Sequence, residues 1–256
     1  MKNNYELKKR IHLMDEIRGF DVLLMVAFHW FYVLGYLLEV PLGVTLFNFF
    51  RPAEPFFAGL FIVICGISCH LSRSNLKRGL LLAGVAVGLS AVMYLFMPEQ
   101  MIWFGILHFL ALAILVFVPL RRLVERIPPA AGIAVCLVLA LLTWNLIGNT
   151  CRIGPGGALA APLPDWMKAQ VWLYPLGLGR GPGDAADYFP FFPWIFIFFI
   201  GCFIGVWAKA GSFPDFAYRR RVPFLSFVGR HALPIYLVHQ PVFYGIGMGV
   251  KWLIGR

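Results

Sequence analysis

The segment Arg18–His29, which reads RGFDVLLMVAFH, carries three ionisable side chains in an otherwise apolar run. At ~100° per residue, Arg18 and His29 fall within roughly 20° of each other around a helix, and Asp21 lies about 60° to one side. An ionisable group at the centre of a membrane-spanning helix costs roughly 2.5–3.5 kcal/mol. We therefore expect these side chains to face protein or water and to have a function there.

The whole chain has the composition of a membrane protein, because 60% of its 256 residues are hydrophobic and only 13% are charged. Apolar runs of the ~20 residues that cross a bilayer recur along it. We predict an all-α, polytopic membrane helix bundle with about seven transmembrane helices. The predicted spans are 17–39, 55–72, 78–97, 100–120, 130–148, 189–209 and 224–254. In the last span, Pro234 and Pro241 predict a kink.

Basic residues predict the orientation of the bundle. They gather before the first span and in every second connection after it, at Lys8–Arg10, Arg73–Arg78, Arg121–Arg126 and Arg219–Arg221. This distribution predicts a cytoplasmic N-terminus, and we expect a bacterial inner membrane. Because it also accounts for the formal charge of +10, nucleic acid is not an expected partner.

We predict a single integral-membrane domain over residues 1–256. Its longest connection, an external loop of about 149–188, is rich in Gly and Pro and contains a short interfacial helix around Asp165–Trp172. The loop is either a cover for an acceptor substrate or a plain linker. The cysteines have no disulfide or metal-binding spacing, so no metal is expected.

The three ionisable side chains of the first span fall into two groups along the helix. Arg18 and Asp21 are three residues apart and can pair, as a structural ion pair or as part of a channel. His29 lies eight residues beyond Asp21, about 12 Å along the helix, so it needs another partner.

Three histidines are expected at similar depth, namely His29, His108 and His239. Each is either a satisfied core residue or a neutral imidazole that can act as a base or nucleophile, and we expect function most at His29. A carboxylate can hold an imidazole in one tautomer. The groups expected to orient His29 or a substrate are Glu54, His108, Asp187, His239 and Gln240.

The cytoplasmic loop Ser72–Gly79 is polar and basic. It is either an ordinary positive-inside signal or a docking site for a polyphosphate such as coenzyme A, which basic side chains and a helix N-terminus bind well. The candidate donor-binding residues are Arg73, Asn75, Lys77, Arg78 and Arg230.

The order and spacing of several short motifs resemble one known family. They are LMDEIRGFD from Leu13, PFFAGLFIVICGIS from Pro55, GILH from Gly105, DYFP from Asp187, GRH from Gly229 and YLVHQP from Tyr236. Together they look like the catalytic domain of the heparan-α-glucosaminide N-acetyltransferase family and its bacterial relatives.

The resemblance implies a transmembrane acyltransferase with acyl-CoA, most simply acetyl-CoA, as the donor co-substrate. The family delivers the acyl group to a sugar amine or hydroxyl on the other side of the membrane. It implies a catalytic histidine near the outer part of the first span, and His29 is the best match. Trp30 follows directly and no asparagine is near, a departure from the animal enzyme that leaves the acceptor open.

Two functional hypotheses follow from these residues. In the first, an acyltransferase uses His29 as a catalytic base or as an acyl-accepting nucleophile. In the second, a proton-coupled transporter uses the buried Arg, Asp and His residues as a path. The oligomeric state is left open between a monomer and a homodimer.

Overall fold

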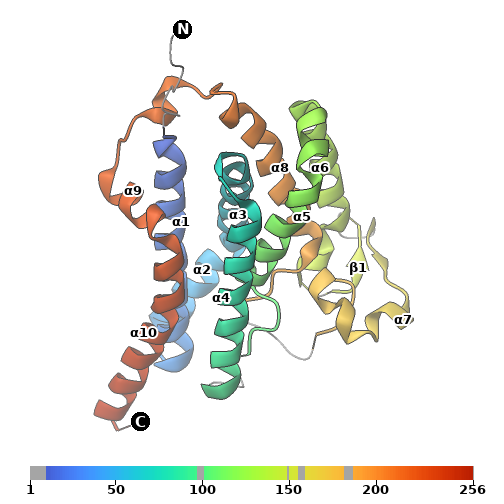
Figure 1. The fold of residues 1–256 in the computed structure, drawn as a ribbon. Helices are drawn as coiled ribbons and strands as arrows, with labels where there is room; N and C mark the ends of the chain where they lie inside the picture. Colours follow the sequence, from blue (N-terminus) through green and yellow to red (C-terminus); the bar gives the residue numbers. More distant parts are fainter. Residues whose placement is uncertain (1–9, 97–100, 149, 155–158, 182–186, 256) are drawn as a thin grey trace. The chain divides into compact units, whose positions relative to one another are not determined.

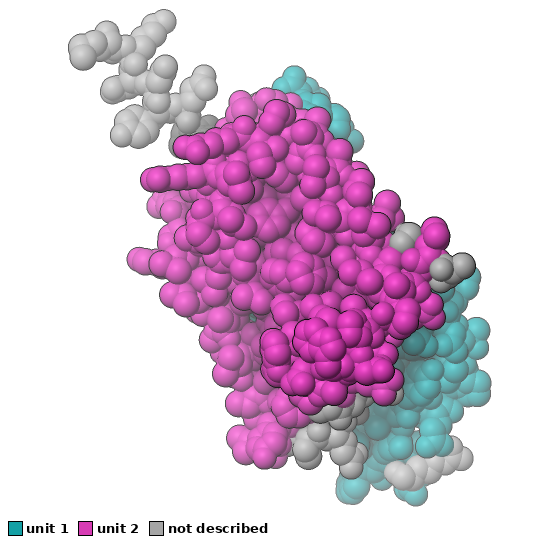
Figure 2. All heavy atoms as spheres, turned by 90° about the vertical axis from the view of Figure 1, so that its right-hand side faces the viewer, with its two compact units in different colours: residues 1–61, 213–256 teal, residues 62–212 magenta. Residues whose placement is uncertain are grey.

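The computed structural model describes residues 10–96, 101–148, 150–154, 159–181 and 187–255. The chain folds into two compact units, drawn in Figures 1 and 2. Unit 1 comprises residues 1–61 and 213–256, and unit 2 comprises residues 62–212. The boundary falls inside one long helix, and each unit is described by itself below.

The predicted helical membrane bundle is confirmed. Within the described residues, six helices are long and apolar enough to cross a membrane. They are His12–Leu37, Pro41–Leu71, Asn75–Leu95, Ile106–Arg126, Pro129–Ile147 and Phe191–Lys209. They correspond in order to the first six predicted spans, so the apolar periodicity of the sequence identified these helices correctly.

Unit 1 is built around the first helix. Helix α1 (His12–Tyr32) continues into a π-helical segment, η1 (Val33–Leu37). The chain then forms α2 (Pro41–Phe50), a 3-10 turn η2 (Arg51–Ala53) and the start of α3 (Glu54–Leu71). After unit 2 it returns through η7 (Asp215–Tyr218), α9 (Pro223–Arg230) and α10 (Ala232–Leu253). Both α9 and α10 pack along α1 (Figure 1).

The predicted seventh span, 224–254, is two helices in the structure. Helix α9 ends at Arg230 and α10 begins at Ala232, with His231 between them. The interruption at His231 falls three residues before Pro234, which has no N–H to donate to the carbonyl group of Arg230 and whose ring disfavours a continuous helix there. A second difference is the helical segment from Pro41, which joins α3 through η2 and for which no helix was predicted.

The contact between α1 and α9 brings two backbones together without intervening side chains. A Cβ atom on Gly19 would lie 2.0 Å from the carbonyl oxygen of Leu225, and one on Gly229 would lie 1.9 Å from that of Asp15. Next to these glycines, Val22, Val228 and Ala232 form a buried apolar cluster. The two glycines therefore set the separation of α1 and α9, and the apolar cluster packs beside this contact.

Unit 2 contains the remaining spans. They are the rest of α3, α4 (Asn75–Phe96), α5 (Ile106–Arg126), α6 (Pro129–Thr143) with η4 (Trp144–Gly148), and α8 (Phe191–Lys209). Helix α4 packs on α5 and α6 packs on α8. Helices α3 and α8 meet closely, since a Cβ atom on Gly66 would lie 2.2 Å from the carbonyl oxygen of Phe198.

The loop predicted at about 149–188 contains two short strands, β1 (Arg152–Ile153) and β2 (Ala161–Pro162), paired antiparallel. They are followed by α7 (Asp165–Lys168) and the 3-10 helix η6 (Val171–Leu176) where a short interfacial helix was predicted. Tyr188 Oη donates a hydrogen bond to the carbonyl oxygen of Tyr174 at 2.7 Å, and the two rings stack at 4.3 Å. These contacts hold the end of the loop against η6.

The close packing of α1 and α9 gives a stability prediction. Gly229→Ala places a methyl group against the backbone of α1, and we expect it to lower the free energy of unfolding by about 1–3 kcal/mol. Gly249→Ala in α10 is the matched control, because a Cβ there has open space and alanine favours helix. Thermal unfolding in detergent measures both variants. Equal melting temperatures for the two would show that α1 and α9 are not packed through their backbones.

Candidate functional site

Two of the predicted histidines come together in unit 1. His29 on α1 and His239 on α10 have ring centroids 5.0 Å apart, with their planes inclined at 51°. Gln240 places its side-chain Nε2 3.5 Å from His29 Nδ1. Because an amide offers both a donor and an acceptor, Gln240 can orient either tautomer of the His29 imidazole. The partner that His29 needs is therefore supplied by α10.

The tautomer of His239 is fixed by its own helix. Its Nδ1 lies 2.7 Å from the carbonyl oxygen of Tyr236, and since a carbonyl only accepts, Nδ1 carries the proton. Its Nε2 therefore presents a lone pair. The residue is only 6% exposed, and Nε2 has no hydrogen-bond partner among the described residues. His239 thus offers a buried proton acceptor next to His29.

Aromatic rings surround this histidine pair. Phe28 meets His29 edge-on at 6.1 Å, and Phe243 meets His239 edge-on at 5.9 Å. Trp30 packs on Phe243 at 4.9 Å. Such an apolar wall lowers the local dielectric, so hydrogen bonds and charges that form beside the imidazoles are stronger than in water.

The ion pair that the structure gives Arg18 is with Asp15, and the expected pairing of Arg18 with Asp21 stays a prediction. The Nη1 atom of Arg18 lies 3.6 Å from a carboxylate oxygen of Asp15, which also accepts a 2.6 Å hydrogen bond from Arg10 Nε. The physical reason is that helical side chains point toward the N-terminus, so Arg18 reaches back one turn. Asp21 is 4% exposed, and both of its carboxylate oxygens lack a hydrogen-bond partner within the described residues.

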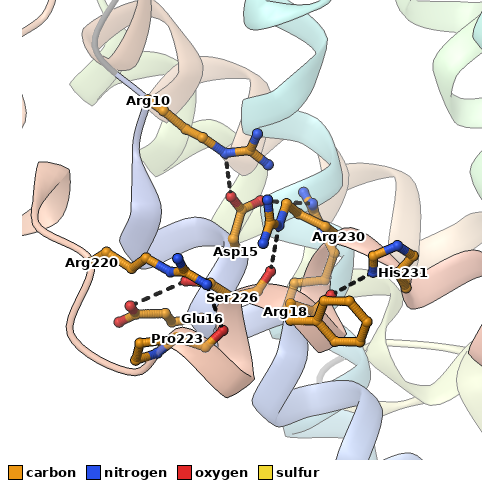
Figure 3. A network of polar contacts seen from close by, with 10 residues as sticks. Arg10, Asp15, Glu16, Arg18, Arg220, Pro223, Ser226, Arg230 and His231 are labelled. Atoms are coloured by element: carbon orange, nitrogen blue, oxygen red, sulfur yellow. Dashed lines mark hydrogen bonds and ion pairs between the residues drawn. The ribbon is translucent and has the colours of Figure 1, made fainter.

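Glu16 joins α1 to α9 through a buried cap. Its Oε1 accepts hydrogen bonds from the backbone N–H groups of Arg221 and Val222, at 2.7 and 2.9 Å, and from Ser226 Oγ at 3.2 Å. Figure 3 shows this carboxylate at the beginning of α9, close to Asp15 and its arginines. Arg230, a predicted donor-binding residue, is exposed and donates from Nε to the carbonyl oxygen of Ser226 at 3.1 Å.

The third histidine, His108, lies in unit 2 at the start of α5. Its Nε2 is 3.2 Å from Ser90 Oγ, which donates to the carbonyl oxygen of Ile102, and its Nδ1 accepts from the Gly105 N–H at 3.4 Å. Both ring nitrogens therefore have local partners in unit 2. An interaction of His108 with His29 remains a prediction.

The two candidate carboxylates have different surroundings. Asp187 is 9% exposed and lies at the N-terminal end of α5, where the missing side chain of Gly105 leaves room for its carboxylate. Glu54 is exposed at the first residue of α3. Their role in orienting His29 or a substrate is not tested by the structure and remains a prediction.

The basic loop Ser72–Gly79 contains exposed residues and residues that bond to α3. Arg73 and Lys77 are exposed, as a docking site requires. Asn75 is buried and donates to the carbonyl oxygen of Cys69 at 2.8 Å, and Arg78 Nη2 lies 3.0 Å from Cys65 Sγ. Asn75 and Arg78 therefore hold the end of α3 against the start of α4.

A comparison with protein families matches the chain to heparan-α-glucosaminide N-acetyltransferase, catalytic, over residues 10–241. The match spans nearly the whole chain. The chain belongs to this family.

Membership of the heparan-α-glucosaminide N-acetyltransferase family confirms the resemblance seen in the motifs, and with the six apolar helices it makes the chain an integral membrane protein of an acetyltransferase family. The family implies acetyl-CoA as the general acyl donor. His29, His239 and Gln240 all lie inside the matched residues. Neither the curated proteins nor the solved structures contain a match.

Several residues of this family member were not singled out from the sequence. The carbonyl group of Tyr236 fixes the tautomer of His239, and a hydrogen bond to a backbone carbonyl cannot be recognised from the sequence. His70 and Glu125 form a polar cluster at the end of α3 and α5. A usable signal existed for His70, because it is an ionisable residue at the end of a predicted apolar span.

The buried cap by Glu16 gives a prediction. Glu16→Ala leaves the Arg221 and Val222 N–H groups without their acceptor, and we expect it to lower the free energy of unfolding by about 1–3 kcal/mol. Asp165→Ala is the control, since this carboxylate is exposed and its ion pair with Lys168 lies on the surface. Denaturant unfolding in detergent compares the two. An unchanged midpoint for Glu16→Ala would contradict the capping role.

Proposed function

We propose that this protein transfers an acyl group, most simply acetyl, from cytoplasmic acyl-CoA to a sugar amine or hydroxyl at the outer side of a bacterial inner membrane. The observation that supports it most is the contact of His29 with His239 and Gln240, inside the part of the chain that matches the acetyltransferase family. His29 is partly buried and His239 is buried, and the His239 Nε2 lone pair has no hydrogen-bond partner among the described residues, so this imidazole pair is suited to accept a proton during acyl transfer.

In the first of two routes, His29 acts as a general base. The acceptor's nitrogen or oxygen attacks the thioester carbonyl carbon while His29 removes its proton. A C–N or C–O bond forms, the C–S bond breaks, and the coenzyme A thiolate leaves. The imidazolium then returns the proton to the thiolate, so that free coenzyme A thiol and neutral histidine are restored.

In the second route, His29 acts as the nucleophile. A ring nitrogen attacks the thioester carbon with its lone pair, the C–S bond breaks, and the proton on the other ring nitrogen passes to the leaving thiolate, so that coenzyme A leaves as the thiol and the acyl group stays on the imidazole. The acceptor's nitrogen or oxygen then attacks the acyl carbon, the C–N bond to the imidazole breaks, and the acceptor's proton returns to the imidazole. Either way, His239 serves as a positioning residue, because its lone pair can take a hydrogen bond from a protonated His29.

The other candidate residues have supporting roles in this proposal. Arg18 and Asp21 line the way by which the donor reaches His29. Residues that orient His29 or the acceptor are Glu54, His108, Asp187, His239 and Gln240.

For the donor's phosphates we propose Arg73 and Lys77, because both are exposed at the start of α4, where a helix N-terminus adds backbone donors. Asn75 and Arg78 hold this loop in shape. Arg230 belongs to the α1–α9 network and adds positive charge in unit 1.

The central prediction concerns His29. His29→Ala should lower the rate of acyl transfer from acetyl-CoA by a factor of about 10²–10⁴, the usual contribution of a general base. Coenzyme A release from purified protein, followed with a thiol reagent, measures it. His12→Ala changes the same residue type at the first turn of the same helix and should keep wild-type turnover. Wild-type turnover in a folded His29→Ala protein would eliminate the proposed role of His29.

A single-turnover experiment separates the two routes. Protein is mixed with radiolabelled acetyl-CoA in the absence of an acceptor, then denatured and separated from free label. Label retained by wild type but not by His29→Ala supports the nucleophile. No retained label, with normal turnover when acceptor is present, supports the base.

The donor-binding assignment gives a second prediction. Removing both charges in Arg73→Gln/Lys77→Gln should raise the KM for acetyl-CoA severalfold and leave kcat nearly unchanged, because phosphate contacts bind ground state and transition state alike. The control, Lys168→Gln/Arg180→Gln, removes two charges from the predicted outer loop and should leave the KM unchanged. An equal KM in the two double variants would show that the phosphates bind elsewhere.

The buried carboxylate of Asp21, whose oxygens have no hydrogen-bond partner among the described residues, favours proton-coupled transport as a second function. A transporter moves its substrate without consuming a thioester. Substrate flux into proteoliposomes with no release of coenzyme A would therefore favour transport and exclude the acyltransferase.

A further inference from the structure

Helix α9 lies beside the first two turns of the membrane-spanning helix α1. A Cβ atom on Gly229 would meet the carbonyl oxygen of Asp15, and one on Gly19 would meet that of Leu225. Helix α1 and its apolar span both begin at His12. With eight residues, α9 is about 12 Å long, far too short to cross an apolar core of about 30 Å. Helix α9 is therefore held at the depth of the lipid headgroups.

The face of α9 that does not contact α1 is apolar and exposed. Val228 packs in the apolar cluster on α1, whereas Phe224 and Phe227 are 63% and 53% exposed. These two phenylalanines are three residues apart, so they share one side of the helix. Phe216 and Val222, which precede the helix, are exposed as well. Large apolar side chains are thus presented to the surroundings of the protein at this depth.

Basic side chains flank the apolar face. Arg219, Arg220 and Arg221 come directly before α9 and Arg230 ends it, and all of them are exposed. Figure 3 shows Arg220 and Arg230 at the two ends of the helix. The guanidinium group of Arg221 lies over the ring of Phe216, 5.5 Å from its centre. The apolar and the basic side chains therefore form one continuous surface.

The carboxylates at this end of unit 1 leave the surface strongly positive. Asp15 is buried and bonds to Arg10 and Arg18, and Glu16 is buried and accepts from backbone N–H groups. The segment 215–230 contains four arginines and a single acidic residue, Asp215. Its exposed arginines are therefore available to an external anion.

We propose that this surface docks into the adjacent membrane leaflet and binds the headgroups of anionic phospholipids. We call it the α9 surface, and its residues are Phe216, Arg219, Arg220, Arg221, Val222, Phe224 and Phe227. The phenylalanines insert between the lipids, and the arginines contact the phosphates. A short amphipathic helix with aromatic and basic side chains lies in a membrane interface in this way. Basic clusters next to a membrane span bind anionic lipids.

The depth of α9 favours a lipid over a soluble protein as the partner. The contact of Gly229 with α1 holds the helix at the end of a membrane span whether or not another protein is present. The proposal concerns unit 1 alone and is independent of the acyl-transfer chemistry.

A fluorescent label on α9 tests where the surface lies. The five native cysteines are buried, so Phe224→Cys in the full-length protein can be labelled selectively. The labelled protein is placed in nanodiscs of phosphatidylcholine, with or without phosphatidylglycerol. A lipid with a spin label near its headgroup quenches a fluorophore in the interface, whereas iodide quenches one in water. We expect quenching by the lipid, stronger with phosphatidylglycerol, and little quenching by iodide.

The same label measures the strength of binding when short-chain phosphatidylglycerol is added to the protein in non-ionic detergent. Arg219→Gln/Arg221→Gln should weaken binding about 25-fold, since each basic residue near an anionic surface contributes about fivefold. The matched control is Arg122→Gln/Arg126→Gln, which removes two exposed arginines from the end of α5 in unit 2. It should bind phosphatidylglycerol as the labelled protein without these substitutions does.

Three results would overturn the proposal. Quenching by iodide but not by the lipid would place the α9 surface in water, and exclusion of both quenchers would show that protein covers it. Equal lipid quenching in the two kinds of nanodisc, or equal affinity in the two double variants, would show that no anionic headgroup is recognised. The nanodisc comparison leaves the arginines intact, so it decides even if Arg219→Gln/Arg221→Gln does not fold.

Discussion

The close approach of α1 and α9 at Gly19 and Gly229 is the constraint on which the rest of unit 1 depends. Because no side chain separates the two backbones, Glu16 can reach the N–H groups of Arg221 and Val222, the two residues that precede α9, and accept hydrogen bonds from them. The same contact fixes where α9 ends. Helix α10 starts two residues after Arg230, alongside α1, and this start places His239 against His29. A small change at Gly19 or Gly229 would therefore be transmitted to the histidine pair.

Much of the fold could be predicted from the sequence, because a bilayer demands long apolar helices and leaves few alternatives. The first six spans were found in order for this reason. The division of the last span at His231 could not be predicted in the same way. Hydropathy reports how apolar a segment is, whereas the break lies three residues before Pro234, whose ring and missing N–H disfavour a continuous helix.

The site was predictable only in part. The depth of His29 and His239 in their helices follows from residue counting, and the structure brings them into contact. The contact of Arg18 with Asp15 could have been predicted from the direction of helical side chains, which point toward the N-terminus. The hydrogen bond of His108 with Gly105 is local to the start of α5, whereas the one with Ser90 depends on the packing of α4 on α5, which no spacing in the sequence encodes.

The hydrogen bond from His239 Nδ1 to the carbonyl oxygen of Tyr236 has a consequence for how the protein tolerates change. A histidine can also be oriented by a carboxylate side chain, which a single substitution can remove and which is costly to bury in an apolar environment. Here the acceptor is the main chain one helical turn earlier. The side chain at position 236 can therefore vary between homologues while the imidazole keeps its tautomer. Only a substitution that disturbs α10 itself would change the tautomer of His239.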